Sequence, residues 1–170
     1  MEEDWTDRML GRWSSLNPEL DVDASQAAER LGRIALHFGR WQDDVFAKLG
    51  LNRGEVGVLY ALRGADSPQR LSPTQLSRAL MLTSAGITGR LDRLERQGLI
   101  ARLQDPNDRR GIVIELTREG AKLANEAMAS GAQATERMMS GLSRGELHTL
   151  ARLLRKLQAA LEPSAAARVG

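Results

Sequence analysis

The chain has no cysteine and only two histidines among its 170 residues. Without cysteine there are no disulfide bonds, no thiolate catalysis and no cysteine-ligated zinc. His37 and His148 stand far apart in the sequence, and neither belongs to a pattern of metal ligands or a catalytic triad. Gly86 and Gly89 form no phosphate-binding fingerprint. The sequence therefore predicts a protein that is not an enzyme and uses neither a metal nor a cofactor.

Long hydrophobic runs are also missing. No apolar stretch approaches the roughly 18 residues that a membrane span needs, and the acidic start MEEDW is unlike a signal peptide. We therefore expect a cytoplasmic protein. The hydrophobic share of 42% is enough for one core, or for a core and a dimer interface.

Charge is nearly balanced overall but unevenly distributed. Lys and Arg number 24 against 22 Asp and Glu, which gives a net charge of +2. Residues 1–30 contain eight acidic and three basic residues, whereas residues 78–118 contain eight arginines and five acidic residues. A basic middle segment suits a polyanionic partner. A solvated surface of mixed charge is the alternative.

Helical periodicity dominates both ends of the chain. Residues 4–16 predict a short amphipathic helix that ends at Asn17-Pro18, and residues 23–49 predict a long helix capped by Asp23. Further helices are expected from Thr117 to about residue 139 and after Ser143. In the last helix, leucines alternate at spacings of three and four, which is typical of a face that packs along a partner helix: Leu147, Leu150, Leu154, Leu157 and Leu161. They predict a homodimer interface, and packing within one chain is the alternative.

The middle of the chain contains three helix starts in close succession. Asn52 with Glu55 and Ser72 with Gln75 match the capping-box pattern, and Thr83 is the next expected N-cap. Residues 99–104 and 112–116 predict two strands joined by the turn DPNDRRG. Three helices followed by a hairpin predict a mainly α fold with a small β-wing, which is a winged helix-turn-helix that reads DNA.

The predicted domain organisation follows from these elements. Residues 1–22 form an extra N-terminal helix and spacer, and residues 51–116 form the DNA-binding domain. Residues 23–50 and 117–162 form a helical dimerisation region, and residues 163–170 form a flexible tail.

The third central helix has the properties of a recognition helix. Ile87, Leu91 and Leu94 share one face, so small residues point outward and let the backbone approach a major groove. Arg93 is the expected reader of a base or a phosphate. The alternative is an ordinary surface helix, in which Asp92 and Glu95 pair with Arg93 or Arg96.

The predicted wing places two arginines near the tip of the hairpin. Arginine is well suited to a narrow minor groove, where the potential is most negative, and we expect Asp108 to orient its neighbour. The predicted DNA-binding residues are Ser72, Thr74, Thr83, Ser84, Ala85, Gly86, Thr88, Gly89, Arg93, Asp108, Arg109 and Arg110.

The run DRRGIVIELT, residues 108–117, matches the pattern D-x-R-x-x-x-x-x-L-T and resembles the wing signature of MarR-family transcription regulators. The resemblance covers residues 24–161, including LSPTQLSRAL and LTSAGITGRLDRLERQGLI. It implies a homodimer that binds a palindromic operator, usually as a repressor released by a ligand. In the family the wing arginine, here Arg110, enters the minor groove and the aspartate, here Asp108, orients it.

A narrower resemblance links the chain to the branch of this family that includes urate-responsive regulators. The segment RWSSLNP, residues 12–18, is similar to that branch's extra N-terminal helix. The resemblance implies that Trp13, Arg78 and Arg90 contribute to a ligand pocket. The branch has an Asp in a GEFD-like motif where this chain has Gly57, so a urate-like ligand loses a hydrogen-bond partner.

Three outcomes stay open for these residues. They bind a urate-like ligand, they bind another small anionic or aromatic molecule, or they are structural. In the structural case Trp13 lies in the core and Arg90 pairs with a carboxylate. For the whole protein, the alternative function is a winged-helix module that dimerises or recruits a protein without binding DNA.

Overall fold

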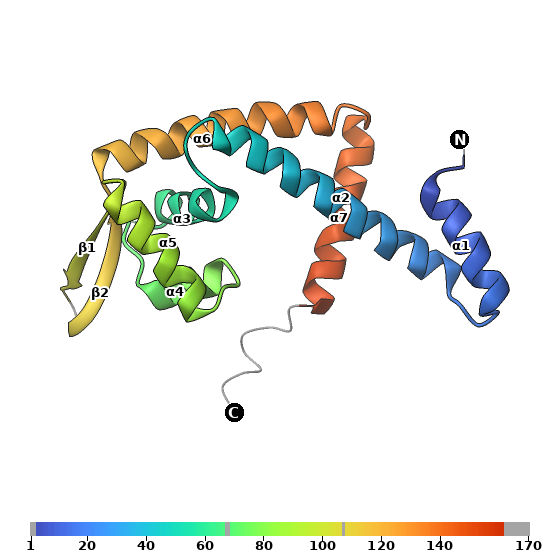
Figure 1. Ribbon diagram of the computed structural model, residues 1–170, viewed down its shortest axis with the longest axis horizontal. Helices are drawn as coiled ribbons and strands as arrows, with labels where there is room; N and C mark the ends of the chain where they lie inside the picture. The colour runs from blue at the N-terminus through green and yellow to red at the C-terminus, as the bar shows by residue number, and fades with distance from the viewer. Residues whose placement is uncertain (1–2, 67–68, 107, 162–170) are drawn as a thin grey trace. The chain divides into compact units, whose positions relative to one another are not determined.

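The computed structural model describes residues 3–66, 69–106 and 108–161, apart from the side chains of Arg109 and Arg110. The predicted tail, residues 163–170, lies outside the described residues. The elements follow the order α1 (Trp5–Leu16), α2 (Val22–Ala47), α3 (Arg53–Arg63), α4 (Pro73–Ala79), α5 (Ser84–Arg96), β1 (Ile100–Asp105), β2 (Asp108–Leu116), α6 (Arg118–Met138) and α7 (Arg144–Leu161) (Figure 1). This order confirms the prediction of a mainly α fold with a small two-stranded wing.

The chain divides into two compact units, residues 1–128 and residues 129–170. The first unit contains the elements from α1 to β2 and the first part of α6. The second contains the rest of α6 and α7. Within the described ranges, no helix combines the length and the apolarity that crossing a membrane requires.

Local capping chemistry sets the starts of the three central helices, as predicted. The Asn52 side chain accepts from the Glu55 N–H at 3.0 Å, and the Glu55 carboxylate accepts from the Asn52 N–H at 2.8 Å. Ser72 and Gln75 make the same reciprocal pair before α4. Thr83 caps α5 by accepting from the Gly86 N–H at 3.2 Å. These bonds satisfy N–H groups that the first turn of a helix leaves without a partner.

The predicted cap of α2 was wrong by two residues. Asp21, not Asp23, accepts from the Ala24 N–H at 2.9 Å, and the helix begins at Val22. Asp21 has the extended backbone that an N-cap requires, with φ −69° and ψ 96°. Asp23 lies in the first turn, where its negative charge still favours the positive end of the helix dipole. The sequence alone does not distinguish Asp21 from Asp23, because aspartate is favoured as an N-cap at either position.

α1 packs on α2 through a small buried contact and one ion-pair cluster. Thr6 and Leu10 are the buried residues of α1. Arg30 of α2 lies 2.6 Å from Asp7 and 3.1 Å from Asp4. The pKa of the Asp7 carboxyl lies below its usual value, first because the Asp4 N–H donates to it and then because of Arg30. α1 is thus held by the burial of Leu10 and by the polar contacts of Asp4 and Asp7 with Arg30.

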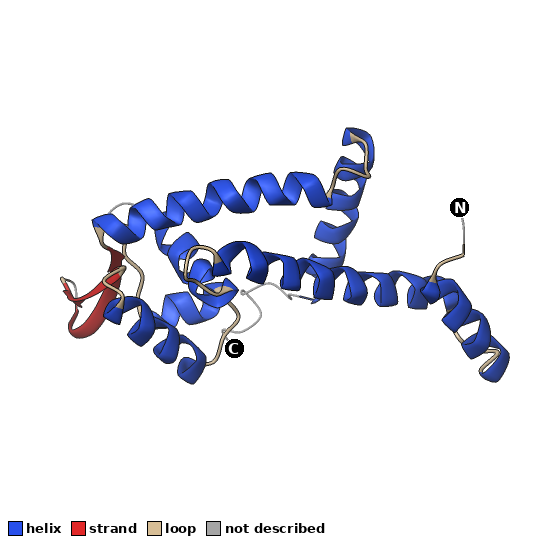
Figure 2. Ribbon diagram, turned by 45° about the horizontal axis from the view of Figure 1, so that its top comes forward, coloured by secondary structure: helices blue, strands red, loops and turns tan. Residues whose placement is uncertain are grey.

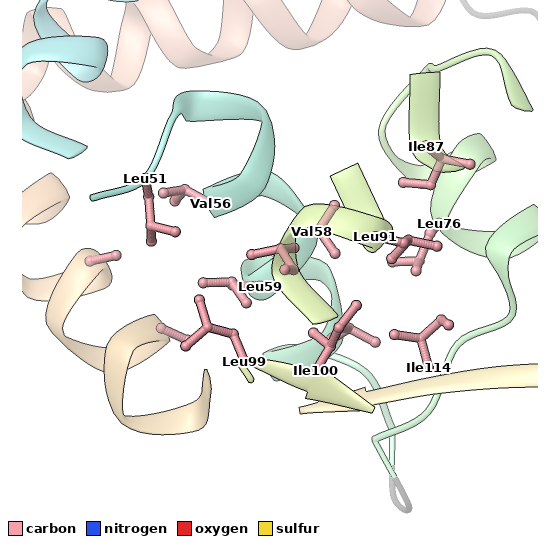
Figure 3. Close-up of a cluster of buried hydrophobic side chains, with 14 of the residues drawn as sticks. Leu51, Val56, Val58, Leu59, Leu76, Ile87, Leu91, Leu99, Ile100 and Ile114 are labelled. Carbon is pink, nitrogen blue, oxygen red and sulfur yellow. The ribbon is translucent and has the colours of Figure 1, made fainter. Parts of the chain in front are cut away.

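The core of the first unit is built around α3, whose Val58, Leu59 and Leu62 are completely buried. Figure 3 shows side chains from α4, α5 and both strands converging on this helix. From α5 come Ile87, Leu91 and Leu94, the predicted inward face, at 2%, 1% and 0% exposure. The prediction of that face is confirmed. Because α5 buries this face on the core, its opposite face points to solvent.

The wing is a pair of strands (Figure 2). The two strands are antiparallel, and Ile100 faces Leu116 while Leu103 faces Val113. Leu71, just before α4, exchanges both backbone hydrogen bonds with Ile114, at 3.1 and 2.9 Å. This bridge fastens the start of α4 to the wing. The predicted turn was too long, because β2 already begins at Asp108 rather than at residue 112. Ladder pairing extends the strand into a polar segment that sequence propensity assigns to the turn.

Candidate nucleic-acid interface and adjoining cavity

The outward face of α5 carries small and hydroxyl side chains, as predicted. Its exposed residues include Ser84, Ala85, Thr88 and Gly89, whereas Gly86 is half-buried. The Thr88 hydroxyl donates to the Ser84 carbonyl at 2.9 Å. Nothing bulky stands on this part of the helix, so its backbone is accessible.

Three of the predicted DNA-binding residues precede α5 in the chain, and two of them cap helices. The Ser72 hydroxyl accepts from the Gln75 N–H at 3.2 Å, so its described role is to cap α4. Thr74 in the first turn of α4 is exposed, and so is Thr83, whose hydroxyl caps α5. Contact of these residues with DNA stays a prediction.

Arg93 is tied to the neighbouring helix rather than standing free. Its Nε lies 2.8 Å from Oε1 of Glu55, and its side chain is 52% exposed while that of Glu55 is 1% exposed. The sequence did not indicate this pair, because Glu55 is 38 positions away and already had a role as a capping residue.

The two acidic residues of α5 bind an arginine of the wing, a contact that the sequence did not predict. The alternative for α5, in which Asp92 and Glu95 pair with Arg93 or Arg96, was wrong about these partners. Both carboxylates bind Arg102 of β1, whose Nη2 lies 2.5 Å from Asp92 and whose Nη1 lies 2.8 Å from Glu95. One guanidinium thus pairs with both carboxylates, offsets one of their two negative charges and joins α5 to the wing.

Two further contacts fix the base of the wing. Arg70 lies 2.7 Å from Glu115 of β2. The Thr117 hydroxyl donates to the Gly98 carbonyl at 2.7 Å and accepts from the Gly120 N–H at 3.0 Å. The threonine that ends the D-x-R-x-x-x-x-x-L-T pattern therefore joins the end of α5 to the start of α6.

The tip of the wing is described only in part. Arg109 and Arg110 lie in β2, but their side chains are outside the described part of the structure. Asp108 is exposed. The expected role of Asp108 and of the two arginines stays a prediction.

A cavity of about 430 Å³ adjoins α5 on the side of α2 and α3. Arg90 lies in it with its guanidinium over Gly54, where an added Cβ would come within 2.6 Å of Arg90 Cζ. Glycine at this position of α3 is therefore what lets Arg90 lie there. The lining residues are Asp43, Asn52, Arg53, Gly54, Gly57, Leu80, Leu82 and Arg90.

A second arginine enters the same cavity in the same way. Arg53 packs over Gly39 of α2 so closely that an added Cβ would collide with its guanidinium. Its Nε lies 3.7 Å from Asp43. Arg53, Gly39 and Asp43 were missed in the sequence, although glycine in the middle of a helix is a signal of close approach by another group. Two guanidiniums and one carboxylate give the cavity a positive character.

The predicted ligand residues do not come together within the chain. Arg90 lines the cavity just described, whereas Trp13 lies on α1 beside a separate cavity of about 340 Å³ that Trp5 also lines. Arg78 of α4 is exposed and borders neither cavity. Trp13 is 43% exposed, so the alternative that placed it in the core was wrong. Among the ion pairs that the described residues form, none joins Arg90 to a carboxylate.

Metal ligands do not gather at either site. Within the ranges that the structure describes, no three His, Asp or Glu residues lie close enough to hold an ion. The arrangement offers an accessible face of α5, a positively charged cavity beside the same helix, and a wing that ion pairs join to α5.

Comparison with known proteins agrees with this architecture. Residues 49–111 match the model of the MarR family. The HTH-type transcriptional regulator PecS of Dickeya dadantii (strain 3937) is 34% identical over 150 residues, which are 88% of this chain and 90% of PecS.

Two solved structures have the same fold. BpsR of Bordetella bronchiseptica, described with regulation of its DNA binding by 6-hydroxynicotinic acid, has a TM-score of 0.69 and 27% identity over 77% of this chain and 91% of its own. Sco3205 of Streptomyces coelicolor in complex with DNA has a TM-score of 0.77 and covers 85% of this chain and 95% of its own. Its 22% identity supports the fold alone. Because the similarity to PecS runs through nearly the whole length of both proteins, this chain belongs to the MarR family of winged helix-turn-helix transcription regulators.

Proposed function

We propose that the protein is a homodimeric regulator that binds a specific palindromic site in double-stranded DNA. We further propose that it acts as a repressor and that a small anionic or aromatic molecule releases it. The observation that carries the DNA-binding proposal is the accessible face of α5, with small residues outward and Ile87, Leu91 and Leu94 anchored in the core. A helix presented in this way fits a major groove.

The wing supplies the second contact in this proposal. Arg110 inserts into the minor groove, where the narrow walls make the potential most negative. Ser72, Thr74, Thr83, Ser84 and Thr88 contact phosphates or base edges, and the start of α5 adds its unpaired N–H groups. The phosphate contacts position the protein, and the contacts to base edges select the sequence.

The first prediction concerns DNA binding itself. Fluorescence anisotropy with duplexes from the region upstream of the protein's own gene should detect a complex. Its log affinity should fall linearly with log salt, because each neutralised phosphate releases counterion. Arg110→Ala should weaken binding by about 1–3 kcal/mol. Arg152→Ala removes the same charge from an exposed position on α7 and should have little effect.

Either of two results would count against this proposal. A folded dimer that binds no duplex at low salt would favour the alternative, a winged-helix module for protein interaction. An Arg110→Ala variant with wild-type affinity at matched salt would remove the wing from the mechanism.

The dimer proposal rests on apolar surface that each unit leaves uncovered. α7 has no buried residue, and Leu154, Leu157 and Leu161 are 40%, 45% and 73% exposed. Leu147 and Leu150 are half-buried on the same face. In the other unit, Leu31 and Ile34 of α2 are 41% and 55% exposed. Contiguous exposed apolar faces mark interaction surfaces, and a symmetric partner is the commonest solution.

The second prediction is that the protein sediments as a dimer at micromolar concentration. Replacing Leu154 and Leu157 together with Asp should yield monomers, because two carboxylates would then be buried without partners. Ala159→Asp introduces one carboxylate on the opposite side of α7 and should leave the dimer intact. A monomeric wild type, or a dimeric Leu154→Asp/Leu157→Asp variant, would contradict the proposed interface.

The ligand proposal rests on the 430 Å³ cavity with its two arginines. Arg90 and Arg53 both enter it, which suits a small anion. Leu80 and Leu82 supply an apolar wall for an aromatic ring. Arg90 belongs to α5 itself, so a ligand that pulls on it acts directly on the recognition helix. Trp13 and Arg78 do not line this cavity, and their part in ligand binding stays a prediction.

The third prediction is that a small aromatic anion binds at Arg90 and lowers DNA affinity. Calorimetry with urate, xanthine and 6-hydroxynicotinate should identify at least one ligand. Arg90→Ala should weaken its binding by about 1.5–3 kcal/mol, the usual contribution of a hydrogen bond to a charged group. Arg144→Ala, on α7, serves as the matched control. If no compound binds, or if binding leaves DNA affinity unchanged, the sensor proposal fails while the DNA-binding proposal stands.

A further inference from the structure

Glu55 is the only charged side chain that is buried in the described part of the chain. It lies in the first turn of α3 and is 1% exposed. A carboxylate removed from water loses much of its hydration free energy, and it is tolerated only where charge and hydrogen bonds compensate. Its placement beside the helix proposed to meet a polyanion therefore requires a reason.

The two carboxylate oxygens of Glu55 have different partners. Oε2 accepts from the Asn52 N–H at 2.8 Å, which completes the capping box of α3. Oε1 lies 2.8 Å from Nε of Arg93 on α5. One oxygen therefore serves its own helix, and the other reaches across to the recognition helix.

The capping box alone does not need a charge at this position. In the box that starts α4, the neutral Gln75 accepts from the Ser72 N–H at 2.7 Å through Oε1. A glutamine would complete the box of α3 equally well. The negative charge of Glu55 thus has a separate partner, and that partner is Arg93.

Glu55 contacts the Nε of Arg93, and this leaves the Nη groups as the part of the guanidinium that can face DNA. Its Nε is engaged, and the side chain is 52% exposed. The Nη groups are the fork through which arginine recognises phosphate or the edge of a guanine. A long side chain that is already held in one orientation loses less conformational entropy when it binds.

We propose that Glu55 is a positioning residue for DNA recognition, which acts by holding Nε of Arg93 so that the Nη fork is oriented toward the DNA. This inference rests on the proposed function of α5 as the recognition helix. Glu55 then acts on Arg93 as a carboxylate acts on any arginine that it orients for a bidentate contact.

The test compares operator affinities of single and double variants. Arg93→Ala should weaken binding roughly 5- to 150-fold, the usual range for one arginine contact. Glu55→Gln keeps the shape and the cap of α3 but removes the charge. It should weaken binding by about fivefold, and by no more than Arg93→Ala does, because it acts through the Arg93 contact. In the Arg93→Ala background the same change should add less than about twofold, because residues acting through one contact are not additive.

The chain offers a matched control for the loss of charge. Glu146 completes the capping box of α7, where it accepts from the Ser143 N–H at 2.8 Å. Glu146→Gln makes the same substitution at the same capping position and should leave operator affinity unchanged. Melting temperatures of all variants separate a change in folding from a change in recognition.

Two results would overturn the inference. One is a Glu55→Gln variant that binds the operator as tightly as the wild type or more tightly. The other is an equal loss of operator affinity when Glu55→Gln is made in the wild type and in the Arg93→Ala variant, which would mean that Glu55 acts only on folding. A wild type that bound no operator would instead overturn the proposed function, and the inference with it.

A second variant tests the same idea at an exposed side chain. Arg93→Lys keeps the positive charge beside Glu55. A lysine ammonium has no planar fork, so it cannot bind Glu55 and also offer a bidentate contact to DNA. The variant should lose about fivefold or more in affinity with an unchanged melting temperature. Wild-type affinity in this variant would contradict a role for the oriented guanidinium.

Discussion

The structure depends on the packing of one face of α5 against α3. Burying Ile87, Leu91 and Leu94 stabilises the unit by about 1.5–3 kcal/mol for each side chain. An ion pair between exposed groups contributes about 0–1 kcal/mol. The apolar face therefore decides where α5 lies, and the ion pairs around it adjust its orientation. The same packing leaves the opposite face accessible.

The acidic residues on and beside α5 are each paired with an arginine. Arg102 covers Asp92 and Glu95, and Arg93 covers Glu55. The basic segment 78–118 is therefore not a uniform positive patch, because its arginines have different partners. Some compensate internal carboxylates, and Arg90 lines a cavity beside the same helix. A ligand in that cavity would contact α5 on the side of α2 and α3, and it would not touch the surface proposed for DNA.

The sequence predicted the features that depend on near neighbours. The capping boxes at Asn52 and Ser72, the cap at Thr83 and the buried stripe of α5 all follow from spacings of three or four residues, so they could be read directly. The partners of Arg93 and Arg102 could not, because those contacts join separate elements. The position of Arg53 over Gly39 depends on how α2 and α3 cross. Periodicity placed Trp13 on the apolar face of its helix, but it does not say what covers that face.

The most direct test of α5 and the wing as the DNA-reading surface is hydrogen exchange measured by mass spectrometry, with and without a duplex selected for binding from a random library. The first N–H groups of a helix have no partner within the helix. At the start of α5 the Thr83 side chain satisfies the Gly86 N–H, so we expect the N–H groups of Ser84 and Ala85 to exchange fastest until a ligand covers them. We predict slowed exchange in peptides covering residues 72–89 and 105–111, with α1 unchanged. Protection confined to α1 and α2, with α5 and the wing unaffected, would contradict the account.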